Sequence, residues 1–181
     1  MVRKSPKQAR QPASPEQCRE PSVPLRDLDS FNLKPCEVEW LHLFRSLLVQ
    51  PRENANAAFA DLHHRAADYY GGEIAPLIVG ATSGLIRALK IERPAPFYFV
   101  SPQCAACRQT VCEDEFLVMC AVVSARCGDD EQLHLAVYRL TQSGEHERLV
   151  QAARSLAQVM NMVSRPSAAV WHGVSAGMRL H

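Results

Sequence analysis

The chain has 181 residues, 47% of them hydrophobic and 22% charged, which is typical of one soluble domain large enough to bury a core. Twenty Lys and Arg face nineteen Asp and Glu, and the net charge of +1 excludes a global basic field for nucleic acid or an anionic membrane. No uncharged stretch reaches the roughly 20 apolar residues of a membrane-spanning helix, so we expect no membrane segment.

The N-terminal segment, residues 1–35, is predicted to be a disordered, basic, proline-rich arm. It holds six of the twelve prolines and almost no apolar periodicity, so it cannot bury enough surface to offset its ordering entropy. Within residues 1–26, six basic and two acidic side chains leave a net charge of +4. This segment is either a solvated tail or a local contact for phosphates, and we expect nucleic acid binding nowhere else. It lacks the apolar core of a secretory signal, which favours a cytoplasmic location.

Residues 36–163 carry apolar stripes at helical spacing and predict an all-α domain, a compact bundle of about six helices. Three helices are expected over about 36–49, 53–70 and 74–89. A fourth should run from near Val111 to Cys127, because Thr110 and Glu113 fit a capping box. A shorter helix follows Asp129-Asp130, and the last follows Ser143-Gly144.

Two segments of this domain carry a more specific expectation. The aromatic run 97–100, after a Pro-rich step, predicts a short extended segment. The run 116–123 is apolar on every side, which predicts a central helix surrounded by others.

Gly80 and Gly84 lie four residues apart inside the third predicted helix. Each costs about 1 kcal/mol relative to alanine in a helix interior. Either another backbone approaches closely at this face, or the helix is simply weak. The sequence leaves both interpretations open.

A resemblance follows from the order of these features. A helical region and a Pro-bounded extended step precede a cysteine and an acidic pair that opens a very apolar helix, Cys112-Glu113-Asp114-Glu115-Phe116-Leu117. Over residues 55–163 this order resembles a group of uncharacterised, mainly alphaproteobacterial helical proteins. The resemblance implies a cytoplasmic bacterial protein of unknown activity and carries over no catalytic residue.

The sharpest chemical feature is the cysteine spacing Cys104-x2-Cys107-x4-Cys112. Two thiolates separated by two residues can hold one ion, and Cys112 is near enough to add a third sulfur to zinc or an iron-sulfur cluster. Cys120 cannot join them, because eight helical residues place it about 12 Å beyond Cys112. The fourth ligand would then come from His63, His64, Cys36 or water.

Two other interpretations of these cysteines stay open. Free cysteines pack as small hydrophobic residues, which we expect of Cys120, and a dithiol in the loop would make the protein a thiol redox sensor. The sequence contains no recognisable catalytic motif, which favours a protein that is not an enzyme. The first turn of the last helix, Glu145-His146-Glu147, would repel a DNA backbone.

Residues 164–181 form an expected flexible tail in which Trp171, Val174 and Met178 share one apolar face. Such a face suits docking into a groove of a partner or onto its own domain. We therefore expect a non-enzymatic interaction or regulatory protein whose partner is another protein. A small metal- or cluster-binding protein is the alternative, and the redox sensor is a second one.

Overall fold

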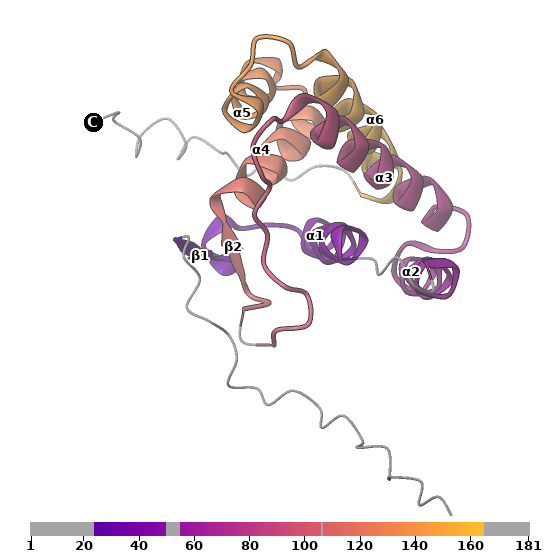
Figure 1. Ribbon diagram of the computed structural model, residues 1–181. Coiled ribbons are helices and arrows are strands. Elements are labelled where there is room, and N and C mark those ends of the chain that lie inside the picture. Colours follow the sequence, from indigo (N-terminus) through magenta and orange to yellow (C-terminus); the bar gives the residue numbers. More distant parts are fainter. Residues whose placement is uncertain (1–23, 50–54, 106, 165–181) are drawn as a thin grey trace, which may run out of the picture.

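The computed structural model describes residues 24–49, 55–105 and 107–164. This part of the chain forms a mostly helical bundle (Figure 1), as the apolar stripes predict. Its six helices are α1 (Pro35–Leu48), α2 (Ala55–Tyr70), α3 (Ala75–Glu92), α4 (Glu113–Cys127), α5 (Asp130–Thr141) and α6 (Glu147–Val163). The remaining elements are two short strands, β1 (Leu25–Asp27) and β2 (Thr110–Cys112), and the 3₁₀ helix η1 (Leu28–Phe31).

The helices begin and end where local chemistry favours it. Pro35 occupies the first position of α1, where its missing N–H loses no hydrogen bond. Gly71 follows α2 and Gly128 ends α4, with φ angles of 86° and 74° that only glycine adopts readily. The Asp129 side chain caps α5 by accepting a hydrogen bond from the Gln132 N–H at 3.0 Å.

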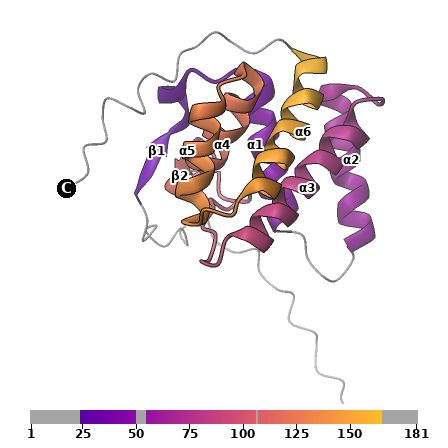
Figure 2. The same ribbon diagram turned by 90° about the horizontal axis from the view of Figure 1, so that it is seen from above.

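The centre of the bundle is α4, as its apolar run predicts. Every residue from 115 to 124 on this helix is buried. It packs against α5 and α6, while α3 packs against α6 and α2. Seen from above, β1 and β2 lie at one edge of the molecule and α2 lies at the opposite edge (Figure 2).

The predicted boundary between arm and domain at residue 35 is wrong. Strand β1 pairs antiparallel with β2, with Leu25 opposite Cys112, and η1 follows it directly. Leu28 is only 3% exposed and belongs to the hydrophobic core. A three-residue strand is too short to display alternation, so the sequence gives no periodic signal here. Residues 1–23 of the expected arm and residues 165–181 of the expected tail lie outside the described residues.

The start of α4 also differs from the prediction. Residues 110–112 are held extended by β1, so the helix begins at Glu113 and its capping box joins Cys112 to Glu115 rather than Thr110 to Glu113. The Glu115 carboxylate accepts a hydrogen bond from the Cys112 N–H at 3.1 Å. The run 97–100 belongs to the loop before β2 and forms no regular element.

Buried ion pairs tie α4 to neighbouring segments. Arg45 of α1 pairs with Glu115 at 2.7 Å, and both side chains are 0% exposed. Arg126, near the end of α4, pairs with Glu37 in the first turn of α1. Charged side chains buried in this way require a partner. These pairs therefore fix how α1 lies against the central helix.

Candidate functional site

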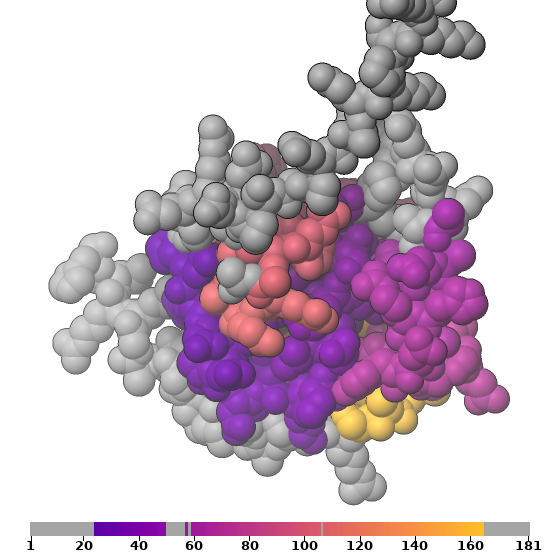
Figure 3. All heavy atoms as spheres, turned by 90° about the horizontal axis from the view of Figure 1, so that it is seen from below, coloured from indigo at the N-terminus to yellow at the C-terminus, as the bar shows by residue number. Residues whose placement is uncertain are grey.

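The cysteine loop lies between α3 and β2, and its described part is at the surface beside the N-terminal elements (Figure 3). Cys104 is disulfide-bonded, so its sulfur is not available as a thiolate ligand. Cys107 is half-buried, and its N–H donates to the Cys104 sulfur at 3.3 Å. Cys112 is buried in β2, where its thiol donates to the Tyr98 carbonyl at 3.1 Å.

These three predicted ligands do not form a metal centre in the structure. Within 24–49, 55–105 and 107–164, no group of three or more His, Cys, Asp or Glu side chains is placed to hold a metal ion. His63 and His64, expected as sources of a fourth ligand, lie on α2, at the edge of the molecule opposite β2 (Figure 2). The His63 ring packs on Phe59, with ring centroids 4.6 Å apart, and His64 is exposed.

The thiols of Cys112 and Cys120 are unreactive as nucleophiles. Burial, assisted by the Glu115 carboxylate, raises the pKa of Cys112 to about 12. Burial also raises the pKa of Cys120 to about 12, with a smaller contribution from Glu113. Both remain neutral at physiological pH and cannot act as thiolate nucleophiles. Cys120 is 6% exposed, which confirms the expectation that it belongs to the core.

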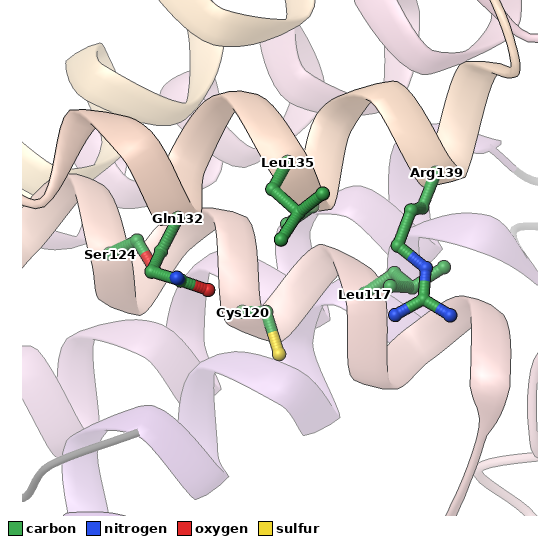
Figure 4. A pocket seen from close by; sticks show the side chains of 7 residues that line it. Leu117, Cys120, Ser124, Gln132, Leu135 and Arg139 are labelled. Atoms are coloured by element: carbon green, nitrogen blue, oxygen red, sulfur yellow. The ribbon is translucent and has the colours of Figure 1, made fainter. Parts of the chain in front are cut away.

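Cys120 also lines a narrow pocket between α4 and α5 (Figure 4). The lining residues are Leu117, Cys120 and Ser124 from α4, and Gln132, Leu135, Ala136 and Arg139 from α5. Its volume of about 10 Å³ is room for about one water molecule. The pocket is therefore a packing defect at a helix contact and too small for a substrate.

A network of hydrogen bonds around Arg45 holds the end of the cysteine loop. The Arg45 guanidinium donates to the carbonyl oxygens of Arg108 and Thr110, at 3.0 and 2.5 Å. Its partner Glu115 also accepts from the Val100 N–H at 3.1 Å. These hydrogen bonds join α1, the end of the cysteine loop and the start of α4, so the network positions the loop.

The predicted partner-binding segments are mostly outside the described residues. Trp171, Val174 and Met178 all lie there, so the structure does not place them. Of the six basic residues in 1–26, only Arg26 is described. It pairs with Glu113 at 2.8 Å and its guanidinium lies 4.6 Å from the centre of the Phe116 ring. The Arg26 side chain therefore contacts α4 of the same chain.

The outer side of α3 carries an exposed stripe made of Leu77, Gly80, Gly84, Arg87 and Ile91. Their spacing of three and four residues places them on one helix face. Leu77 is 47% exposed and Ile91 is 56% exposed. A Cβ atom built on Gly80 or Gly84 would meet no heavy atom within 4 Å. The expected close approach of another backbone is thus not made by any described residue of this chain.

A wider cleft of about 880 Å³ lies where the end of α3 meets α5 and the start of α6. His134 of α5 and His146, just before α6, both line it and contact each other, with Nδ1 of His134 3.4 Å from Nε2 of His146. Glu92 also lines the cleft, and its carboxylate accepts hydrogen bonds from the N–H groups of Arg148 and Leu149. No local sequence pattern predicts this pair, because His146 lies twelve residues and a turn after His134. A histidine on each side of Ser143-Gly144 was the available signal.

No single described helix is both long and apolar enough to cross a bilayer; α2 and α3 pass that test only together, as a pair bent by 120°. The α3 stripe presents two exposed large hydrophobic side chains, Leu77 and Ile91, on one helix face. Comparisons with models of protein families, with curated proteins and with solved structures found no match to this chain.

Proposed function

We propose that this protein is a non-enzymatic interaction protein whose α3 stripe receives a helix of another protein. The observation that carries the proposal is the pair of exposed glycines, Gly80 and Gly84, at the centre of the stripe. Each costs about 1 kcal/mol relative to alanine in a helix interior. The described chain places no atom in the space that the missing side chains leave open. We infer that the backbone of a partner helix fills this space.

The chemistry of the stripe indicates what kind of helix fits it. Glycines four residues apart let two helix backbones approach closely, so the partner helix can cross α3 at this point. Leu77 and Ile91 flank the crossing and offer apolar contact on either side. Arg87 lies within the stripe and forms no ion pair or hydrogen bond with any described residue. We therefore expect an amphipathic partner helix with small or apolar residues at the crossing and a carboxylate near Arg87.

The experiment uses the full chain as bait in a lysate of the organism that encodes it. Wild type is compared with Gly84→Leu, which fills the open space on α3, and with Gln158→Leu, which adds the same side chain to an exposed position of α6. The protein captured by the wild type is then purified and its affinity for each variant is measured. We expect at least a tenfold loss for Gly84→Leu and wild-type affinity for Gln158→Leu.

Two outcomes would contradict the proposal. Equal affinity of the wild type and Gly84→Leu would show that the partner binds elsewhere. Self-association of the purified chain, abolished by Gly84→Leu with no other partner captured, would assign the stripe to a second copy instead. Gly84→Leu should fold, because leucine is a better helix former than glycine and its Cβ would meet no heavy atom within 4 Å at this exposed position.

A thiol redox sensor is the second candidate, and the disulfide at Cys104 supports it. A sensor needs a bond in the loop that reductant opens and oxidant closes. If this is the function, mild reduction should change partner affinity in the wild type, and Cys104→Ser should fix the protein in one state. The same affinity with and without reductant would remove this candidate.

The cellular setting is also part of the proposal. We place the interaction in the bacterial cytoplasm, supported by the buried thiols of Cys36, Cys112 and Cys120, which form no disulfide. In that compartment the disulfide of Cys104 must be a reversible, redox-sensing bond. Measuring the oxidation state of these thiols in protein isolated under acid quench tests that placement. Extensive oxidation of the exposed Cys127 would argue against a reducing compartment.

A further inference from the structure

We propose that His134 and His146 form a binding site for Zn²⁺ in the cleft between α3, α5 and α6. The site is separate from the cysteine loop, and its cleft shares only Ile91 with the α3 stripe. It is built from one histidine on α5 and one in the turn before α6. A zinc ion there would join the two helices across the turn that connects them.

The hydrogen bonds around His146 fix which of its nitrogens is available. Its Nδ1 lies 2.9 Å from the Ser143 carbonyl oxygen, which can only accept, so Nδ1 carries the proton. In the neutral ring, Nε2 then holds a lone pair, which without metal accepts the hydrogen bond from Nδ1–H of His134. Zinc would take the place of that proton between the two nitrogens. A zinc-bound histidine commonly donates its other N–H to a backbone carbonyl in the same way, because that contact fixes the tautomer and the ring orientation.

The separation of the two nitrogens matches shared coordination. Zinc binds imidazole nitrogen at about 2.0–2.1 Å with tetrahedral geometry, which places two ligand nitrogens about 3.3 Å apart. The observed separation between Nδ1 of His134 and Nε2 of His146 is 3.4 Å. An ion placed off the line between these atoms reaches both of them. His134 then carries its proton on Nε2, a change of tautomer that leaves the neutral ring intact.

The rest of the cleft favours a cation with an open coordination shell. Glu145 and Glu147 line it together with Glu92, against one cation, Arg148. Glu92 already caps α6, whereas Glu145 and Glu147 are exposed. No third His, Cys, Asp or Glu side chain in the described part of the chain stands with the two histidines as a ready ligand. Water, or Glu145 or Glu147 after rotation of its side chain, completes the shell.

The experiment is a calorimetric titration of the full chain with Zn²⁺, using the metal alone. His134→Gln removes one ligand at an exposed position and should leave the fold unchanged, as checked by circular dichroism without metal. The matched control is the double variant His63→Gln/His64→Gln on α2. We expect one binding event that His134→Gln and His146→Gln each weaken at least tenfold, while the α2 variant binds as the wild type does.

A variant with Cys107→Ser and Cys127→Ser separates the histidine site from thiol binding. If that variant keeps the event and His134→Gln loses it, the assignment to the histidines holds. If the cysteine variant loses the event, or His134→Gln binds zinc as the wild type does, the assignment is overturned. Absence of any binding event up to millimolar zinc would overturn it as well.

Discussion

At the scale of single residues, the best-defined interaction is the ion pair of Arg45 and Glu115. Both side chains are fully buried, and the arginine also donates to two carbonyl oxygens at the end of the cysteine loop. Removing one member of such a pair leaves an uncompensated buried charge or donor. The pair therefore links the position of the loop to the packing of α1 on α4.

Glu115→Gln should lower the free energy of unfolding by about 3–5 kcal/mol, because the Arg45 guanidinium loses its counter-charge in the core. Asp61→Asn, which breaks the exposed pair of Asp61 and Arg65, should lower it by no more than about 0.5 kcal/mol. Urea denaturation of both variants measures the difference. Similar losses for the two variants would mean that the buried pair contributes no more than a surface one.

His42 gives the fold a specific acid dependence. Burial, together with the Arg108 and Arg45 guanidinium groups, lowers the pKa of His42 from 6.5 to about 4. Between these values the unfolded chain binds a proton on His42 and the folded protein does not. Stability is therefore lost as pH falls from about 6.5 to about 4.

His42→Gln should flatten this part of the stability curve relative to the wild type, because glutamine does not titrate. Unfolding free energies measured by urea denaturation at several pH values from 7 to 4 test this. Parallel curves for the two proteins across that range would show that His42 does not contribute.

At the scale of secondary structure, the helices follow from sequence and the sheet does not. Apolar stripes, Gly71, Gly128 and the Asp129 cap place the helix ends within a few residues, because helical periodicity and capping are local. Strands β1 and β2 are three residues each and pair across more than eighty residues of chain. Strands this short show no alternating pattern, and their distance along the chain gives no local signal, so the pairing is not predictable from the sequence.

The same distinction applies to the candidate sites. The cysteine spacing is visible in the sequence, but the burial of Cys112 and the disulfide of Cys104 depend on the fold. Gly80 and Gly84 are equally visible, but only the structure decides that no described residue occupies the space beside them. His134 and His146 meet only because α5 and α6 fold back on one another.

Leu28→Ala tests whether η1 belongs to the domain. Its side chain is buried in the core, so truncation should lower the free energy of unfolding by about 2–5 kcal/mol. Asp29→Ala at the exposed neighbouring position should change it by about 0.5 kcal/mol or less. Denaturant unfolding measures both. A negligible effect of Leu28→Ala would mean that η1 does not pack on the core and belongs to the disordered arm that the composition predicts.

At the scale of the whole molecule, the bundle separates structural groups from exposed ones. The buried ion pairs and the thiols of Cys112 and Cys120 stabilise or fill the interior around α4. The α3 stripe faces outward on a different helix and takes no part in that interior. Substitutions in the α3 stripe are therefore expected to leave the core unchanged.

The most direct test of the α3 stripe is a nuclear magnetic resonance comparison of the free chain and its complex with the captured partner. Backbone amide signals of Gly80 and Gly84 report on the stripe, while those of Gly71, Gly128 and Gly144 report on other positions. We predict that the Gly80 and Gly84 signals shift or broaden on binding and that the other three stay in place. Unchanged Gly80 and Gly84 signals in a saturated complex would contradict the proposed function.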